Sequence, residues 1–105
     1  MNIQIIGDNF NVSAHTKSLV EEKIGVRLDK LLQHFAPEMK TALLHIEKDK
    51  HDDFNLNIDM NLPGKEHIFA KTTHKILESG LIDLCQEVET QIKKYKDKLA
   101  NYSLG

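Results

Sequence analysis

The stretch Phe54–Leu62 (FNLNIDMNL) decides the fold, because its residues alternate strictly between apolar and polar side chains. Alternation with a period of two is the pattern of a half-buried β-strand, since successive side chains point to opposite faces of a sheet. Asparagine and aspartate occupy every second position, so one face of the predicted sheet is open to water, which is typical of an antiparallel sheet. The apolar positions are Phe54, Leu56, Ile58, Met60 and Leu62.

Three other stretches are predicted to form the neighbouring strands. Residues 2–6 (NIQII), 41–48 (TALLHIEK) and 67–73 (HIFAKTT) have the apolar content or the alternation of strands. Polar turns at residues 49–53 and 63–65 separate the last three strands, and connections this short join antiparallel strands.

Two helices are predicted from apolar residues that recur every three or four positions. The first, over residues 14–35, follows Ser13, a good N-cap, and Pro37 is expected to end it. The second, over residues 74–102, has a longer apolar stripe that passes through Gly80 without a break. The first stripe contains Val20, Ile24, Leu28, Leu31, Leu32 and Phe35, and the second contains Leu77, Leu81, Leu84, Val88, Ile92, Tyr95, Leu99 and Tyr102.

The element order is therefore β-α-β-β-β-α, which predicts a single α+β domain over residues 1–105. We expect a four-stranded mixed sheet, in which a right-handed helical crossover joins the first two strands in parallel and hairpins join the others. Both helices have one apolar face and the sheet has one polar face. The two helices should therefore pack on the same side of the sheet.

Composition excludes several classes of protein. The chain has 14 basic and 16 acidic residues, a net charge of −2, so bulk positive charge cannot drive binding to nucleic acid. No apolar run approaches the roughly 18 residues of a membrane helix, and the first residues lack the features of a signal peptide. The single cysteine, Cys85, fits a reducing compartment. We therefore expect a cytoplasmic protein with no membrane partner.

Charges are sorted to different sides of the first predicted helix. A basic column runs beside the apolar stripe at steps of four, three and four, and it consists of Lys23, Arg27, Lys30 and His34. Acidic residues fall elsewhere on the helix, at Glu21, Glu22 and Asp29. A solvated amphipathic face explains the presence of these charges, but it does not require the basic residues to be in register.

The end of the second predicted helix is also basic, with four lysines among residues 93–98. Lys94 and Lys98 are four apart and share a column beside the apolar stripe, whereas Lys93 lies well off that column. One or two cations would be enough to complement the helix dipole at this end. Two basic columns on neighbouring helices instead predict a phosphate-binding surface, a shallow groove in which cations from the two segments converge.

Side chains with catalytic potential do not form a recognisable active-site pattern. The six histidines lack paired metal-ligand spacing, and the chain has no glycine-rich phosphate loop. Cys85 lies near the buried stripe, with no histidine and aspartate arranged around it to activate a thiol. We therefore predict no catalytic residue, no metal, no cofactor and no small-molecule substrate.

Two motifs resemble one known family. Residues 7–13 (GDNFNVS) are similar to the opening of the ribosome hibernation-promoting factors, also called protein Y, ribosome-associated inhibitor or sigma-54 modulation proteins. Residues 91–99 (QIKKYKDKL) are similar to the closing helix of that family, and the element order agrees across the chain. The resemblance implies a fold like that of double-stranded-RNA-binding domains. It also implies a short form, without the C-terminal dimerisation domain of longer relatives.

The resemblance further implies a function. Such a protein would bind the small ribosomal subunit and its ribosomal RNA between head and body, and would sterically block translation in stationary phase or stress. On the second helix the basic positions of the family carry over to Lys94 and Lys98. On the first helix they carry over to Lys23 when counted forward, or to Arg27 and Lys30 when counted back. With Lys93 as a further candidate, the expected RNA-binding residues are Lys23, Arg27, Lys30, Lys93, Lys94 and Lys98.

Two alternatives remain open. A protein–protein interaction module that modulates a transcription or translation factor would use the polar sheet face or an edge strand. A small enzyme would need a cleft that holds a histidine with a shifted pKa.

In relatives the basic column of the second helix continues toward its N-terminus, where this chain has Glu87 and Thr90. That difference should weaken phosphate binding or move it toward the end of the helix.

Overall fold

Four strands form one mixed sheet in the computed structural model, which describes residues 1–104 apart from the side chains of residues 37 and 101–104. The strands lie in the sheet in their order along the chain; β1 pairs with β2 in parallel, and the other two pairs are antiparallel. This confirms the predicted topology. The bounds are β1 (Asn2–Asp8), β2 (Thr41–Lys48), β3 (Phe54–Leu62) and β4 (Glu66–His74).

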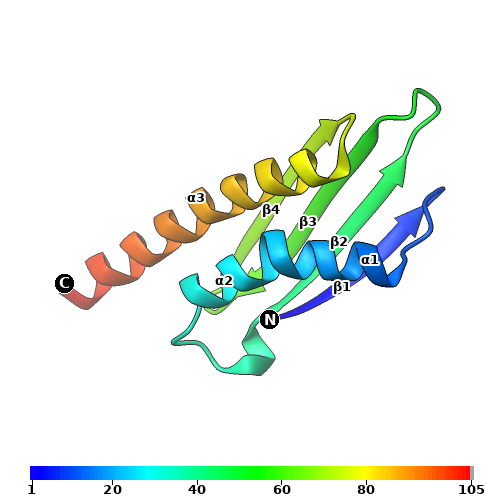
Figure 1. The fold of residues 1–105 in the computed structure, drawn as a ribbon. Helices are drawn as coiled ribbons and strands as arrows, with labels where there is room; N and C mark the ends of the chain where they lie inside the picture. Colours follow the sequence, from blue (N-terminus) through cyan, green and yellow to red (C-terminus); the bar gives the residue numbers. More distant parts are fainter. Residues whose placement is uncertain (105) are drawn as a thin grey trace.

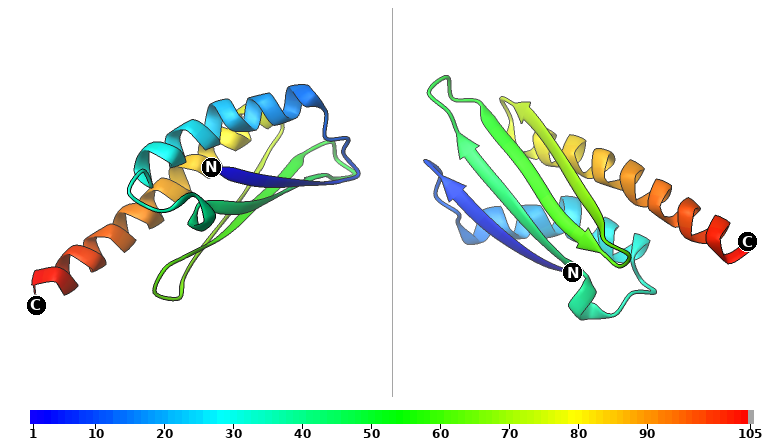
Figure 2. Two further views of the ribbon diagram at one scale, coloured as in Figure 1. Left: turned by 90° about the horizontal axis from the view of Figure 1, so that it is seen from below. Right: turned by 180° about the vertical axis from the view of Figure 1, so that it is seen from behind.

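The helices cover one face of this sheet and leave the other face open (Figures 1 and 2). The first helical segment is continuous and contains α1 (Ala14–Val20), a π-helical turn η1 (Glu21–Gly25) and α2 (Val26–Leu31). A short 3-10 turn, η2 (Pro37–Met39), leads into β2, and α3 (Leu77–Leu104) closes the fold. The C-terminal end of α3 projects beyond the sheet (Figure 2).

The first helical segment ends earlier than predicted. Leu32 caps α2 with φ −112° and ψ 24°, so the helix ends at Leu31 and not at Phe35. Pro37 begins η2 and does not stop the helix. The ring of Phe35 nevertheless packs 6.2 Å from the ring of Tyr95. Phe35 therefore contacts the core although the helix has already ended. Its position continues the helical spacing of apolar residues in the sequence, and for this reason the predicted end of the helix was wrong.

The π-helical turn explains how the first helical segment keeps one buried face. Residues spaced by four drift about 40° per step around a regular α-helix, since it has 3.6 residues per turn. In η1 the N–H of Val26 donates to the carbonyl of Glu21, an i to i−5 bond that widens the turn and offsets this drift. As a result, five residues at steps of four are all buried: Thr16, Val20, Ile24, Leu28 and Leu32.

The core lies between the helices and the sheet. It contains most of the predicted apolar positions, and twelve of its larger side chains are less than about 2% exposed. One predicted position differs, because Leu99 is 42% exposed; the prediction for the Tyr102 side chain falls outside the described residues. The buried apolar residues on the sheet are Ala42, Leu44, Ile46, Leu56, Ile58, Met60, Leu62, Ile68 and Ala70, and those on α3 are Leu81, Leu84, Cys85, Val88, Ile92 and Tyr95.

The turn after β1 sets the position of the first helix. A Cβ on Gly7 would lie 2.2 Å from the carbonyl oxygen of Phe10, so no larger residue fits there without a backbone shift. Asn9 adopts a left-handed φ of 53°, and its side-chain amide donates to the carbonyl of Lys48 at the end of β2. The hydroxyl of Ser13 accepts from the N–H of Thr16 at 3.2 Å, which confirms the predicted N-cap.

Candidate nucleic-acid interface

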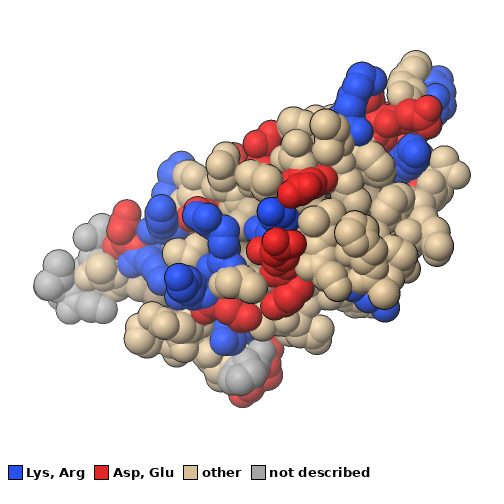
Figure 3. Space-filling view, in the orientation of Figure 1, with Lys and Arg blue, Asp and Glu red and all other residues tan. Residues whose placement is uncertain are grey.

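A shallow groove of about 310 Å³ lies between α2 and α3, and three cations line it. Arg27 and Lys30 come from α2, and Lys93 comes from α3. Figure 3 shows that Lys and Arg side chains gather over α2 and the C-terminal half of α3, with carboxylates at the border of this cluster. Cations from two separate segments of the chain thus converge on the helical face, as the sequence predicts. The other lining residues are Val26, Leu31 and Glu89.

Three hydrogen bonds made by two side chains fix the rotation of α3 about its axis. The side-chain amide of Gln91 donates to the carbonyl of Phe69 and accepts from its N–H, so it binds the outer edge of β4. One turn later, the hydroxyl of Tyr95 donates to the carbonyl of Pro63 at 2.9 Å. These bonds hold one edge of α3 against β4 and the turn before it, and Lys93 therefore lies on the opposite edge, toward α2.

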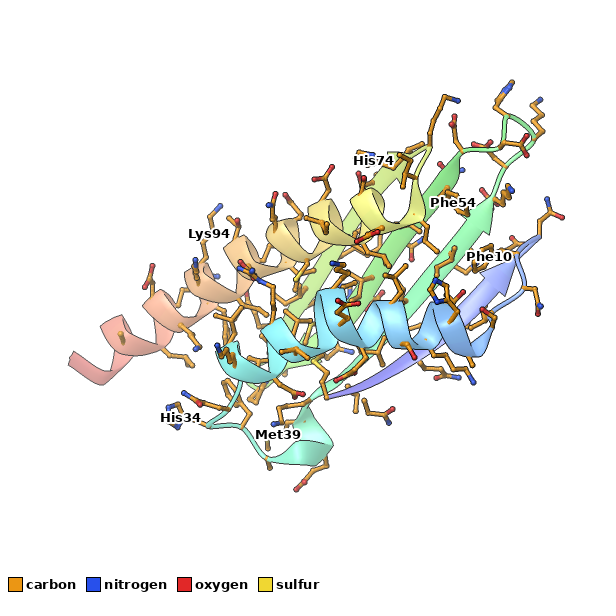
Figure 4. The ribbon with its side chains drawn as sticks, viewed as in Figure 1. Phe10, His34, Met39, Phe54, His74 and Lys94 are labelled. Atoms are coloured by element: carbon orange, nitrogen blue, oxygen red, sulfur yellow. The ribbon has the colours of Figure 1, made fainter. Side chains whose placement is uncertain are left out.

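Lys94 and Lys98 lie on the edge of α3 that faces away from the groove. Neither residue lines the groove, and Figure 4 shows Lys94 projecting from the side of α3 opposite to α2. The ammonium of Lys98 is 3.4 Å from a carboxylate oxygen of Glu66 on β4. The expectation that Lys94 and Lys98 converge with the first basic column is therefore wrong in geometry. Lys93, which lies off the predicted column, lines the groove beside α2.

Two cations of the first helical segment are paired with carboxylates of α3. Arg27 bonds Glu89, and the ammonium of Lys23 lies 3.1 Å from a carboxylate oxygen of Glu78. The hydrogen bond with Glu89, together with the charge of that carboxylate, raises the pKa of Arg27. Within the described part of the chain, ion pairs are found for neither Lys30 nor Lys93, and both side chains are exposed.

The predicted column on the first helix is one residue too long. His34 lies in the turn after α2 and is not in helical register with Lys30, because the helix ends at Leu31 (Figure 4). Conversely, Lys96 was not predicted, although it follows Lys93 by three positions and Glu89 by seven on α3. Residues at that spacing share one face of a helix, so Lys96 lies on the side that faces α2.

The cysteine is a packed thiol. Its side chain is 2% exposed, and burial raises the pKa of the Cys85 thiol to about 11, with a smaller contribution from the carboxylate of Glu89 at 4.0 Å. A thiol with a raised pKa is a poor nucleophile at neutral pH. Among the described residues, groups of three or more His, Cys, Asp or Glu side chains placed to hold a metal ion are not found.

The alkylation of Cys85 should reveal this shift. In the folded protein, the rate with iodoacetamide should keep rising up to about pH 11, because only the thiolate reacts. At pH 8 it should be at least about 100-fold slower than that of an exposed thiol with a pKa of 9, because burial also limits access of the reagent. In urea the midpoint should return to the ordinary value. A folded-state rate at pH 8 equal to that of an exposed thiol would contradict the burial argument. The same shift lowers the stability of the fold as the pH rises from 9 to 11, since the unfolded chain loses this proton first.

The open face of the sheet is mostly polar, with a few exposed apolar side chains. Leu43 and Phe69 are 39% and 44% exposed, and Asp59 lies between them in the register of the strands. A ring nitrogen of His67 is 2.5 Å from the Asp59 carboxylate. Across the described residues, no helix has both the length and the apolar composition required to cross a membrane.

The fold and the groove define a class of protein. It is a small α+β domain in which the helices on one side of the sheet carry a cluster of cations. The family described as Sigma 54 modulation protein / S30EA ribosomal protein matches residues 3–100, and this chain belongs to it. A relative named ribosome hibernation promotion factor, from Staphylococcus aureus (strain COL), is 23% identical over 100 residues. That match covers 94% of this chain and 50% of the relative, so the chain spans about half the length of that relative.

A solved structure has the same fold. The crystal structure of the Thermus thermophilus Protein Y N-terminal domain superposes with a TM-score of 0.74 at 23% sequence identity. The match covers 90% of this chain and 99% of that domain. The β-α-β-β-β-α order predicted from the sequence is confirmed, and the fold is shared with that domain.

Proposed function

We propose that this chain is a ribosome hibernation factor of the cytoplasm, which binds the small ribosomal subunit through its ribosomal RNA. The observation that carries the proposal is the groove between α2 and α3, where Arg27, Lys30 and Lys93 meet on a chain of net charge −2. Membership of the family and the name of the Staphylococcus aureus relative support the ribosome as the partner. No chemical step is needed for this function, because occupying the space of messenger and transfer RNA is enough to block translation.

Phosphate contacts would supply most of the affinity. Lys30 and Lys93 are exposed cations, and an RNA strand in the groove would exchange its condensed counterions for them. Recognition of this kind depends on the shape of the RNA backbone more than on base sequence. A local cluster of cations would thus allow a protein with a negative net charge to bind RNA.

The remaining predicted residues enlarge the proposed surface. Lys94 and Lys98 form a second cationic edge on the other side of α3, and Lys23 lies one helical turn before Arg27, where it is paired with Glu78. The C-terminal end of α3 projects beyond the sheet, so both of its edges are accessible (Figure 2). An RNA partner that contacts both edges would have to surround this helix, and a crevice between two parts of a subunit could do so.

Co-sedimentation with purified small subunits across a salt series tests this proposal. Three phosphate contacts predict that affinity falls roughly 20- to 40-fold between 50 and 200 mM salt, from the counterions that the RNA releases. Large subunits, which carry RNA of similar charge density, are the matched control and should bind far less. Binding that does not respond to salt, or that is equal for both subunits, would contradict the proposed mechanism.

A further inference from the structure

Fewer cations of the first helical segment are available to a ligand than its sequence implies, because carboxylates of α3 form ion pairs with two of them. Lys23 and Arg27 are one helical turn apart, and each is paired with a glutamate of α3. The two carboxylates, Glu78 and Glu89, are the intramolecular competitors of any phosphate that approaches these cations. An RNA phosphate can bind Lys23 or Arg27 only when it displaces the glutamate that is paired with that cation, or when the phosphate and the glutamate share the cation.

Glu89 is the stronger of the two competitors. It lines the groove itself, its side chain is 13% exposed, and it bonds Arg27 directly. Glu78 is 53% exposed, so water and salt screen its attraction to Lys23 more strongly. A carboxylate inside the groove also repels phosphates that approach Lys93, which lies one turn further along α3.

We propose that Glu89, assisted by Glu78, is an affinity-setting counterion that keeps the groove from binding RNA at full strength. This inference rests on the proposed function and assigns the groove a built-in restraint. Its consequence is selectivity. A single phosphate gains little by displacing a carboxylate from Arg27, whereas an RNA surface that also engages Lys30 and Lys93 gains enough contacts to do so.

The test is the affinity of the Glu89→Gln variant for purified small subunits at 100 mM salt. Glutamine keeps the shape of the side chain and removes its charge. We expect binding to tighten roughly three- to tenfold, because a phosphate no longer has to displace a carboxylate from Arg27. Glu78→Gln should tighten binding less. An unchanged affinity for Glu89→Gln would overturn the inference.

Glu87→Gln is the matched control, because it makes the same change of charge on an exposed residue of the same helix. Ion pairs of Glu87 are not found within the described residues. Its affinity should stay within about twofold of the original, since only screened long-range repulsion is removed. Equal gains for Glu87→Gln and Glu89→Gln would show a net-charge effect and would overturn the local role.

A double-mutant cycle separates this inference from the proposed function. In an Arg27→Ala background the gain from Glu89→Gln should fall by at least half, because the cation that Glu89 holds is absent. A full gain in that background would contradict competition for Arg27. If the original chain binds small subunits and only the cycle fails, the proposed function stands and the counterion role does not. If the original chain does not bind at all, the proposed function itself is wrong.

Discussion

Reversing the three groove cations together, as Arg27→Glu, Lys30→Glu and Lys93→Glu, should abolish binding to small ribosomal subunits. We expect a loss of at least about 100-fold at 100 mM salt, because three attractive contacts become repulsive in one place. The fold should persist, since Arg27, Lys30 and Lys93 are all exposed. Circular dichroism and urea unfolding check the fold, and co-sedimentation measures the binding.

The matched control reverses three other exposed lysines, Lys50, Lys65 and Lys71, and so makes the same change of net charge. Lys50 and Lys65 lie in the two hairpin turns, and Lys71 lies on the open face of the sheet opposite the helices. A control loss of only a few-fold is expected from long-range repulsion. If both triple variants lose binding equally, net charge determines the affinity and the groove has no special role.

Truncating one core residue of α3, Ile92→Ala, should cause a large loss of stability. Its side chain is 0% exposed and packs in the single core between helices and sheet. Removing buried methyl groups and leaving a cavity costs about 2–5 kcal/mol, a large part of the total stability of a domain this size. Urea unfolding followed by circular dichroism measures this change.

Ile82→Ala is the matched control, with the same residue type on the same helix. Ile82 is 39% exposed, and alanine is a better helix former than isoleucine. We expect a change of about 1 kcal/mol or less. Equal destabilisation by the two substitutions would contradict the orientation of α3, on which the position of Lys93 depends.

The sheet could be predicted from the sequence because its signal is local. Alternation in residues 54–62 shows which side chains are buried, and short polar turns show which strands are neighbours. The bounds of β2 and β3 agree with the prediction residue for residue. Strand period and turn chemistry depend on adjacent residues, so no knowledge of tertiary contacts is needed.

The groove could be predicted only in part, because its members depend on how two helices are rotated. A helical projection gives the angle between Lys93 and Lys94, but it does not show which of them faces α2. The bonds of Gln91 to β4 settle that question, and they depend on the register of the sheet. The pairing of Arg27 with Glu89 joins residues 62 positions apart, and a pattern within one helix cannot reveal it.

The reactivity of individual lysines, measured free and bound to small subunits, tests the groove most directly. Acetylation of the intact chain, read by mass spectrometry, requires no substitution. Lys30 and Lys93 should become protected on binding, while Lys50 and Lys71, on the hairpin tip and the open sheet, should stay reactive. Protection of Lys50 and Lys71 with unchanged reactivity at Lys30 and Lys93 would contradict the account, since RNA would then lie against the sheet and not between α2 and α3.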